Sequence, residues 1–227
     1  MQCPFNDRFT LTPSDQQLAI DQHFIPIIHA LSRFEDVQTT REQTKAIVNG
    51  DPTMNVSPED QAIVLRLKRG LTYIIEHDGP YQLQTSLAIN GIVAQDEALD
   101  WGTLRTGQIQ IGGVDFVPPI PVQATVEAQI TRILASHTSL TYRALLLMFN
   151  IMRAQLFWDG NKRTAFLTAN YLMSHAGVGL VYVTENQLTT FHQLLSAYYE
   201  AGAGSALTKL IQWTAENCIH GPSTLKS

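Results

Sequence analysis

The sequence predicts a mainly helical protein with one small β-hairpin. Apolar residues recur at helical spacing from Ser14 to about Arg33 and in most later segments. Typical helix-start and helix-stop residues bound these segments. Only the stretch 101–119 alternates polar and apolar residues in the pattern of a strand.

The N-terminal half reads as an extended arm followed by helices. Residues 1–13 form the expected arm, and the helix from Ser14 has Pro26 as a predicted kink. A short helix, "TTREQTKAIVN", is closed by Asn49-Gly50. A further helix begins after Ser57, where Pro58 takes the first turn and acidic residues suit the helix dipole. Gly79-Pro80 ends it, and another helix is expected to reach about Val93.

The segment 101–119 is predicted to form the hairpin. Gln108, Ile109, Gln110 and Ile111 alternate, Gly112-Gly113 supplies a turn, and Pro118-Pro119 follows. Later expected elements are two helices in 121–157, a turn at Asp159–Asn161, a helix to Gly177, a short strand in "GLVYV", a helix after the Thr184/Gln187 capping box, and a helix from about Ser205 to Cys218.

No repeat or low-complexity linker divides the chain. The expected organisation is an N-terminal extension over 1–56 and a helical core over 57–227, with the hairpin at about 101–119. A chain of 227 residues that is 44% hydrophobic is long enough to bury a substantial core.

Composition excludes several classes of protein. The net charge of −5 argues against a dedicated nucleic-acid binder. The start of the chain lacks the apolar region of a signal peptide, and no apolar run reaches the roughly 20 residues of a membrane helix. Cys3 and Cys218 have no partner motif, so neither a disulfide framework nor a zinc site is expected. We expect a soluble, cytoplasmic protein.

Residues 155–166, "QLFWDGNKRTAF", carry the candidate chemistry. Asp, Gly and Asn are ordinary turn residues, so a simple connector is one interpretation. Lys162 and Arg163, however, place two cations at the start of a helix, whose free N–H groups and dipole favour anions. Asp159 adds a hard carboxylate suited to Mg²⁺. The turn is therefore a candidate site for a magnesium nucleotide.

The same residues resemble the motif of the Fic/Doc family, H-x-F-x-[DE]-G-N-[GK]-R-x-x-R. The match comprises six positions: Phe157, Asp159, Gly160, Asn161, Lys162 and Arg163. "GTLRTGQIQIGG" with the prolines beyond it resembles the family's flap, and "TKAIVNG" resembles the inhibitory helix of one subclass. The resemblance covers roughly residues 40 to 215.

The resemblance implies transfer of AMP from ATP to a Ser, Thr or Tyr hydroxyl of a target protein. Asp159 would hold Mg²⁺; Gly160, Asn161, Lys162 and the helix start would cradle the phosphates; and Arg163 would neutralise charge during transfer. The flap residues Gln108, Ile109, Gln110, Ile111 and Gly112 would align the target segment by strand addition. Neither membrane nor nucleic-acid binding is expected, and a homodimer is left open.

Gln155 occupies the place of the family's general base. An amide forms hydrogen bonds but has no useful proton affinity, and loss of such a base typically costs about 10²–10⁴ in rate. Gln155 is still able to orient a hydroxyl, and phosphoryl transfer depends heavily on positioning.

The second departure concerns charge. Phe166 replaces an arginine that contacts the γ-phosphate in many members, which removes a charge-assisted bond of about 1.5–3 kcal/mol. Lys162 resembles the Doc branch, some of whose members transfer the γ-phosphate.

The third departure lies in the inhibitory-type helix, whose candidate residues are Thr44, Val48 and Asn49. Val48 stands where the inhibitory glutamate would be, so we predict a helix that covers the site without blocking it through a carboxylate. An ordinary core role for Val48 fits the same residues.

Three functions remain open: a slow or atypical AMP transferase, a catalytically silent protein that binds nucleotide or a peptide, and a transferase for a γ-phosphate or another phosphodiester donor. A likeness limited to the fold is a fourth reading.

Overall fold

The computed structural model describes residues 5–52 and 55–223, which form nine α-helices, two short 3₁₀ helices and two short strands. The α-helices are α1 (Pro13–Ser32), α2 (Arg41–Asn49), α3 (Pro58–Glu76), α4 (Leu83–Val93), α5 (Gln123–Leu134), α6 (Leu140–Ala154), α7 (Asn161–His175), α8 (Leu188–Ala201) and α9 (Ser205–Asn217). The 3₁₀ helices are η1 (Arg33–Glu35) and η2 (Glu185–Gln187), and the strands are β1 (Leu180–Val181) and β2 (Ile219–His220). The predicted helical fold is confirmed.

Local capping explains several of these boundaries. The Thr12 hydroxyl accepts a hydrogen bond from the Asp15 N–H at the start of α1, and Ser57 accepts one from Asp60 at the start of α3. Thr40 and Gln43 form a reciprocal capping box on α2, which ends at Gly50 with φ 80°. Pro26 lies inside a continuous α1. These termini follow the predicted ones because each depends on neighbours in sequence.

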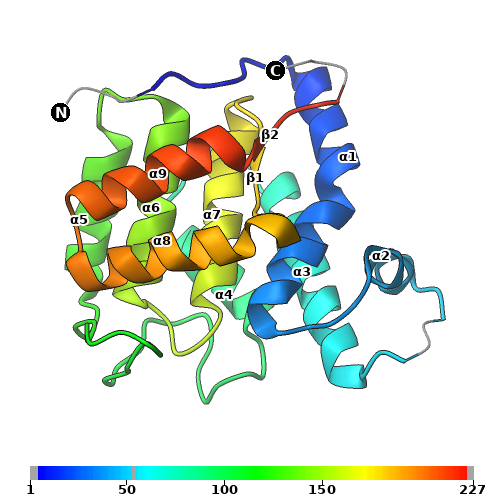
Figure 1. Ribbon diagram of the computed structural model, residues 1–227, viewed down its shortest axis with the longest axis horizontal. Coiled ribbons are helices and arrows are strands. Elements are labelled where there is room, and N and C mark those ends of the chain that lie inside the picture. Colours follow the sequence, from blue (N-terminus) through cyan, green and yellow to red (C-terminus); the bar gives the residue numbers. More distant parts are fainter. Residues whose placement is uncertain (1–4, 53–54, 224–227) are drawn as a thin grey trace.

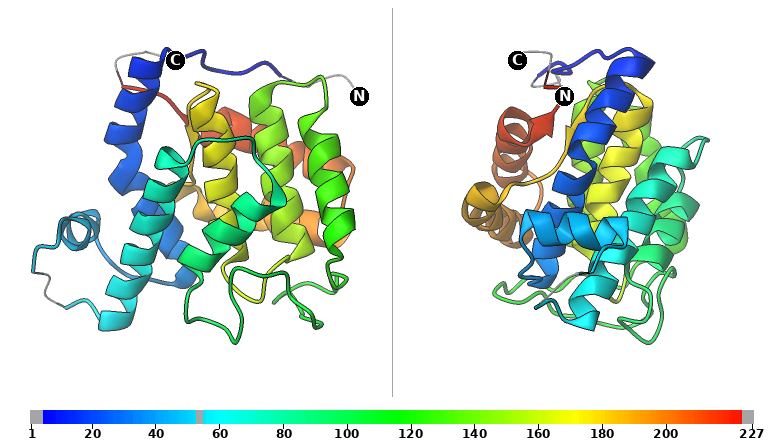
Figure 2. Two further views of the ribbon diagram at one scale, coloured as in Figure 1. Left: turned by 180° about the vertical axis from the view of Figure 1, so that it is seen from behind. Right: turned by 90° about the vertical axis from the view of Figure 1, so that its right-hand side faces the viewer.

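Helix α7 is the centre of the molecule, and most of its side chains are buried. Figures 1 and 2 show α8 and α9 across one of its faces and α3 and α4 on the opposite face, with α6 and α1 at its sides. Gly70 permits the close packing of α3: a Cβ at this position would lie 2.6 Å from Val93 Cγ1 and 2.9 Å from Leu167 Cδ1. Helix α2 lies at the edge, packed on α1 and α3.

The two strands join the end of the chain to the segment after α7. β1 pairs antiparallel with β2, with Leu180 opposite His220 and Val181 opposite Ile219. The predicted strand in "GLVYV" is therefore confirmed, and its partner is the C-terminal segment. The N-terminal arm meets the same region, where the Leu11 N–H donates to the Gly177 carbonyl over 2.7 Å.

The segment 101–119 differs from the prediction. It forms an extended loop with a turn at residues 112–113, and no β-ladder is present among its residues, all of which are described. An isolated two-stranded hairpin is only marginally stable in water. The ends of this loop are instead held by the Arg105 side chain, which donates to the carbonyls of Gly107, Pro118 and Pro119.

The sequence led us to expect neither a membrane helix nor a disulfide framework. Within residues 5–52 and 55–223, every helix is too short or too polar to cross a membrane. Cys218 is a buried free thiol, and Cys3 lies outside the described residues.

Candidate active site at the turn between α6 and α7

The turn from Gln155 to Asn161 is closed by its own side chains. Helix α6 ends at Ala154, and the next residue, Gln155, has φ 46° in the left-handed region. The Asn161 amide accepts a hydrogen bond from the Phe157 N–H over 3.0 Å and donates to the Phe157 carbonyl over 2.8 Å. The Asn161 side chain therefore fixes the turn, and its two polar atoms are used within the protein.

Gly160 is required at the N-cap of α7. Its φ is 71°, and a Cβ at this position would lie 2.8 Å from the Ala94 Cβ. With no side-chain cap present, the N–H groups in the first turn of α7 are the groups of the turn best placed to bind an anion.

A buried asparagine on α4 holds this turn from behind. The Asn90 Nδ2 donates to the Asp159 carbonyl over 2.9 Å and to the Thr164 hydroxyl over 3.2 Å. Its Oδ1 accepts from the Gly102 N–H over 2.8 Å. One amide thus joins the candidate site, α7 and the start of the flap loop.

Arg163 is fully buried and surrounded by carboxylates. Its Nη1 donates to the Val93 carbonyl over 2.5 Å and to Glu97 Oε1 over 3.0 Å, and its Nη2 contacts the other Glu97 oxygen. Its Nε lies 2.6 Å from Glu35 Oε1, and Nη2 lies 3.4 Å from Asp159 Oδ1. Burial opposes its charge, but hydrogen bonding to Glu97 and the charges of the three acids raise the pKa of Arg163 overall.

A carboxylate from η1 contacts Arg163, as an inhibitory glutamate would contact an arginine of the site. This carboxylate belongs to Glu35. The sequence predicted that the inhibitory-type helix, α2, contributes no carboxylate, and Glu35 lies outside α2. Burial raises the pKa of Glu35, Arg163 opposes the shift, and the charges of Asp159 and Glu97 add to it. The environment of this acid therefore favours its neutral form more than water does.

The three residues singled out in α2 make contacts away from the turn. Thr44 is buried and lies 3.1 Å from His29 Nδ1 and 3.0 Å from the Thr39 hydroxyl. Val48 is buried, and its carbonyl accepts a hydrogen bond from Lys68 over 2.7 Å, while Asn49 is exposed. The contacts of Val48 suit the core role that the sequence left open.

Gln155 has a half-buried side chain whose amide is already engaged. The side-chain Nε2 donates to the Met152 carbonyl over 2.7 Å. The main-chain carbonyl of Gln155 accepts a hydrogen bond from Arg105 Nε over 2.5 Å. Burial raises the pKa of the nearby Tyr199, the neighbouring Tyr198 adds to this, and an interaction with Gln155 opposes it. The side chain of Gln155 is a neutral amide, and in the sequence it takes the place of the histidine of the family's motif.

Asp159 and Lys162 are the charged residues of the turn that remain accessible. The Asp159 side chain is 46% exposed, with Oδ1 accepting the Gly160 N–H. Lys162 Nζ lies 5.7 Å from the centre of the Phe34 ring, which stacks on the fully buried Phe166 at 5.3 Å. Two rings therefore occupy the position beside α7 where a second arginine would lie.

The fit of a magnesium ion depends on Asp159. The described residues contain no group of three or more His, Cys, Asp or Glu side chains able to hold a metal. Mg²⁺ is commonly bound through one or two carboxylates together with substrate phosphates and water, so a single accessible Asp159 suits a nucleotide-borne ion.

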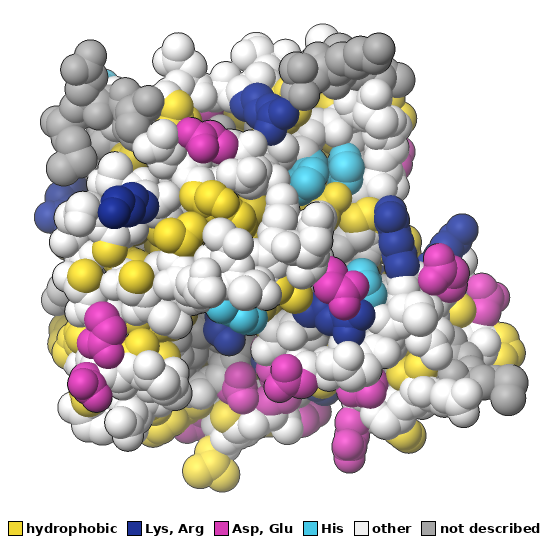
Figure 3. All heavy atoms as spheres, viewed as in Figure 1, with side chains coloured by type: hydrophobic (Ala, Val, Ile, Leu, Met, Phe, Trp, Pro, Cys, Tyr) yellow, Lys and Arg dark blue, Asp and Glu magenta, His cyan; other side chains and the backbone are white. Residues whose placement is uncertain are grey.

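The surroundings of the turn are acidic. Figure 3 shows acidic side chains gathered on the lower half of the molecule, the half in which Figure 1 places the end of α6 and the start of α7. Together with the carboxylates around Arg163, this field opposes anions, whereas Lys162 and the positive end of the α7 dipole favour them.

The flap loop keeps the predicted alternation although it forms no strands. Gln108, Gln110 and Gly112 are exposed, while Ile109 and Ile111 are half-buried. Arg105, only 1% exposed, binds the loop at both ends and also donates to the carbonyls of Ala154 and Gln155. The flap and the candidate site are therefore held by one guanidinium.

The family profile described as the Fic/DOC family matches residues 80–173, which span α4, the flap loop and the motif. Over these residues the chain is similar to the Fic/DOC family. A search of curated proteins gave no match.

Solved structures of Fic-domain proteins have the same fold as this chain. A Fic-domain-containing signalling protein from Bacteroides thetaiotaomicron is similar with a TM-score of 0.77 at 17% identity, covering 91% of this chain and 86% of that one. A Fic family protein from Desulfovibrio desulfuricans gives 0.66 at 14% identity, covering 95% and 75%. Fic-1 from C. elegans gives 0.69 at 18% identity, and the match covers 88% of this chain and 62% of that one.

Gln155, Asp159 and Gly160 lie in the turn between α6 and α7, and Asn161, Lys162 and Arg163 lie in the first turn of α7. Sequence reasoning missed four residues: Glu35, Asn90, Glu97 and Arg105. Arg105 had a signal, since it lies within the flap motif "LRTGQIQ". The two glutamates had none, because their contact with Arg163 joins segments far apart in the chain.

Proposed function

We propose that this protein is a latent AMP transferase that modifies a hydroxyl of a target protein. The observation that carries the proposal is the accessible pair formed by the Asp159 carboxylate and the uncapped start of α7, with Lys162 beside them. This pair combines a metal ligand with donors for phosphate oxygens.

In the proposed reaction, the target hydroxyl oxygen attacks the α-phosphorus of ATP. A bond forms between that oxygen and phosphorus, the bond to the bridging oxygen breaks, and pyrophosphate leaves. Mg²⁺ held by Asp159 would offset negative charge on the phosphates. Gln155 orients the hydroxyl by a hydrogen bond, and the proton passes to solvent because an amide is not basic.

The carboxylates around Arg163 support the latent state. Arg163 is paired with Glu97 and Glu35 and has no exposed surface, so a phosphate oxygen reaches it only after a carboxylate is displaced. Two features therefore slow the proposed enzyme: it lacks a general base, and Arg163 is paired with carboxylates.

The proposal is tested by incubating the protein with α-labelled ATP, Mg²⁺ and a cell lysate. Wild type is expected to give faint labelling of protein, and Gln155→His should increase it by about 10²–10⁴. Asp159→Ala should abolish the label while leaving the melting temperature close to that of wild type, since Asp159 is half exposed. Label that appears only in Gln155→His would contradict transfer by the natural protein.

A second candidate function is nucleotide binding without transfer, and the full pairing of Arg163 favours it. Isothermal titration separates the two: Mg-ATP bound equally by wild type and Gln155→His, with no label from either, would establish binding alone. Label from γ-labelled but not α-labelled ATP would instead establish phosphate transfer, for which Lys162 is the supporting residue.

A further inference from the structure

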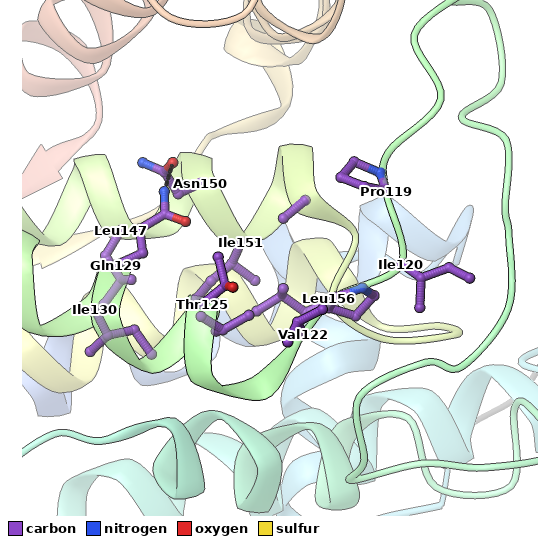
Figure 4. A pocket seen from close by; sticks show the side chains of 13 residues that line it. Pro119, Ile120, Val122, Thr125, Gln129, Ile130, Leu147, Asn150, Ile151 and Leu156 are labelled. Atoms are coloured by element: carbon purple, nitrogen blue, oxygen red, sulfur yellow. Dashed lines mark hydrogen bonds between the residues drawn. The ribbon is translucent and has the colours of Figure 1, made fainter.

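An apolar cavity adjoins the candidate site but has no part in the proposed nucleotide chemistry. It encloses about 300 Å³ between α5, α6 and the segment 119–122 that follows the flap loop (Figure 4). Its walls include Pro119, Val122, Ile130, Leu147, Ile151 and Leu156. No charged side chain lines it, so its occupant is neutral.

One end of the cavity carries a pair of amides. Gln129 Nε2 donates to Asn150 Oδ1 over 2.6 Å, and Asn150 Nδ2 donates to the Leu146 carbonyl over 2.6 Å. These bonds leave Gln129 Oε1 without a protein partner among the described residues, and Figure 4 shows Gln129 and Asn150 side by side at this end. A main-chain N–H entering the cavity would find an acceptor there.

The cavity is fixed relative to Gln155. Ala154 and Leu156, the two sequence neighbours of Gln155, both line it. Arg105 Nη2 donates to the Pro119 carbonyl over 2.6 Å and to the Ala154 carbonyl over 3.3 Å. The same guanidinium also donates to the main-chain carbonyl of Gln155, so one side chain links the wall of the cavity to Gln155.

Exposed apolar side chains gather at this rim. Val117, near the end of the flap loop, is 52% exposed, and Ile120 and Val122, which line the cavity, are 40% and 62% exposed. An extended polypeptide that lies along residues 108–117 would continue onto this rim. None of the phosphate-binding groups, which belong to residues 159–163, lines the cavity.

We propose that the cavity binds a large apolar side chain of the target polypeptide, close in sequence to the hydroxyl presented at Gln155. The proposal rests on the proposed function, whose substrate it specifies. Neutral lining matches a neutral side chain, and the volume at the lower end of ligand pockets suits one aromatic or branched aliphatic group. The cavity thereby selects target segments by their sequence next to the modified residue.

The experiment uses a library of ten-residue peptides with a central Tyr, Ser or Thr, incubated with the immobilised protein without ATP. Wild type is expected to retain peptides with Leu, Ile, Phe or Trp at one fixed position about 10-fold better than those with Lys or Glu there. Thr125→Trp, at the exposed rim of the cavity, should fill it and abolish this preference. Thr131→Trp, exposed on the same helix but outside the cavity, is the matched control and should retain it.

Three outcomes overturn the proposal: equal retention of charged and apolar peptides, a preference unchanged by Thr125→Trp, or a dimer that Thr125→Trp converts to a monomer in sedimentation. The last would make the cavity an interface between copies of the chain. Peptide selection without labelling from ATP would support the cavity proposal and contradict AMP transfer. Labelling from ATP without peptide selection would support AMP transfer and contradict the cavity proposal.

Discussion

At the scale of single residues, the charge balance around Arg163 dominates the site. Glu35, Glu97 and Asp159 face this one buried cation, and Arg66 shares Glu97 at 2.5 Å. Glu97 is held by two arginines, whereas Glu35 contacts Arg163 through one oxygen and lies on a short 3₁₀ helix. Of the two glutamates, Glu35 is therefore the one that an incoming phosphate would displace at the lower cost.

Glu35 also predicts a pH dependence of stability. Because its pKa in the folded protein is raised above the ordinary 4.5, the stability that it contributes is full below pH 4.5 and is lost as the pH rises through the folded value. Glu35→Gln should remove this loss, so the free energy of unfolding of the variant should fall less than that of wild type over this range. Urea unfolding at a series of pH values measures it.

The matched control is Glu42→Gln on the exposed face of α2, which should leave the pH profile unchanged. If the free energies of unfolding of wild type and Glu35→Gln changed in parallel with pH, the pKa of Glu35 would not be raised in the folded protein.

At the scale of secondary-structure elements, the short sheet β1–β2 fastens the C-terminus through aromatic stacking. The His220 ring stacks on Tyr182 with centroids 3.9 Å apart, and His23 lies 5.4 Å from His220. The His23 ring nitrogens lie 3.1 Å from the Tyr182 hydroxyl and 2.9 Å from the Gly221 carbonyl. Burial lowers the pKa of His220 to about 4, and the charges of His23 and Arg8 add to the effect.

This histidine predicts a loss of stability in acid. A folded pKa below 6.5 means that the stabilising contribution is complete above pH 6.5 and is lost as the pH falls toward 4. The loss should amount to about 2–3 kcal/mol, and His220→Phe, which keeps the stacking, should remove it. Denaturant unfolding between pH 7 and 4 provides the measurement, with the exposed His137→Phe as control. An equal loss in wild type and His220→Phe would contradict the assignment.

Elements governed by local chemistry were predicted from sequence, and those governed by distant contacts were not. The caps at Ser57 and Thr184 and the end at Gly50 depend on residues within one turn, and the structure has them as predicted. The hairpin strands over 101–119 were predicted from alternation alone, but the segment is held by Arg105 and has no neighbouring strand. The contact of Glu35 with Arg163 joins residues 128 positions apart, and no local pattern reports it.

At the scale of the whole molecule, Arg105 joins the flap loop to the helical core. This cation has carbonyl oxygens as its acceptors, from Gly107, Pro118, Pro119, Ala154 and Gln155, and burial lowers its pKa. The main-chain N–H of Arg105 donates to the Leu156 carbonyl over 2.9 Å. The position of the flap relative to the motif is therefore set by one side chain.

Arg105→Lys should loosen the flap without unfolding the core. An ammonium has three donors on a flexible stem and cannot reproduce the planar set of bonds made by a guanidinium. We expect amide hydrogen exchange in residues 106–117 to become about 10-fold faster or more, with little change in α7. Arg132→Lys on the exposed side of α5 is the control. A uniform acceleration over the whole chain would mean that Arg105 serves global stability alone.

The position of Asn90 also bears on how the protein ages. Gly91 follows it, and asparagine before glycine is the pair most prone to deamidation, in which the following main-chain nitrogen attacks the side-chain amide. Within α4 that nitrogen is held in the helix, so the attack is blocked while the fold is intact. Once α4 opens, conversion of Asn90 to an acid would replace the donor to the Asp159 carbonyl and Thr164 with a negative charge. Brief unfolding would thus leave permanent damage beneath the phosphate-binding turn.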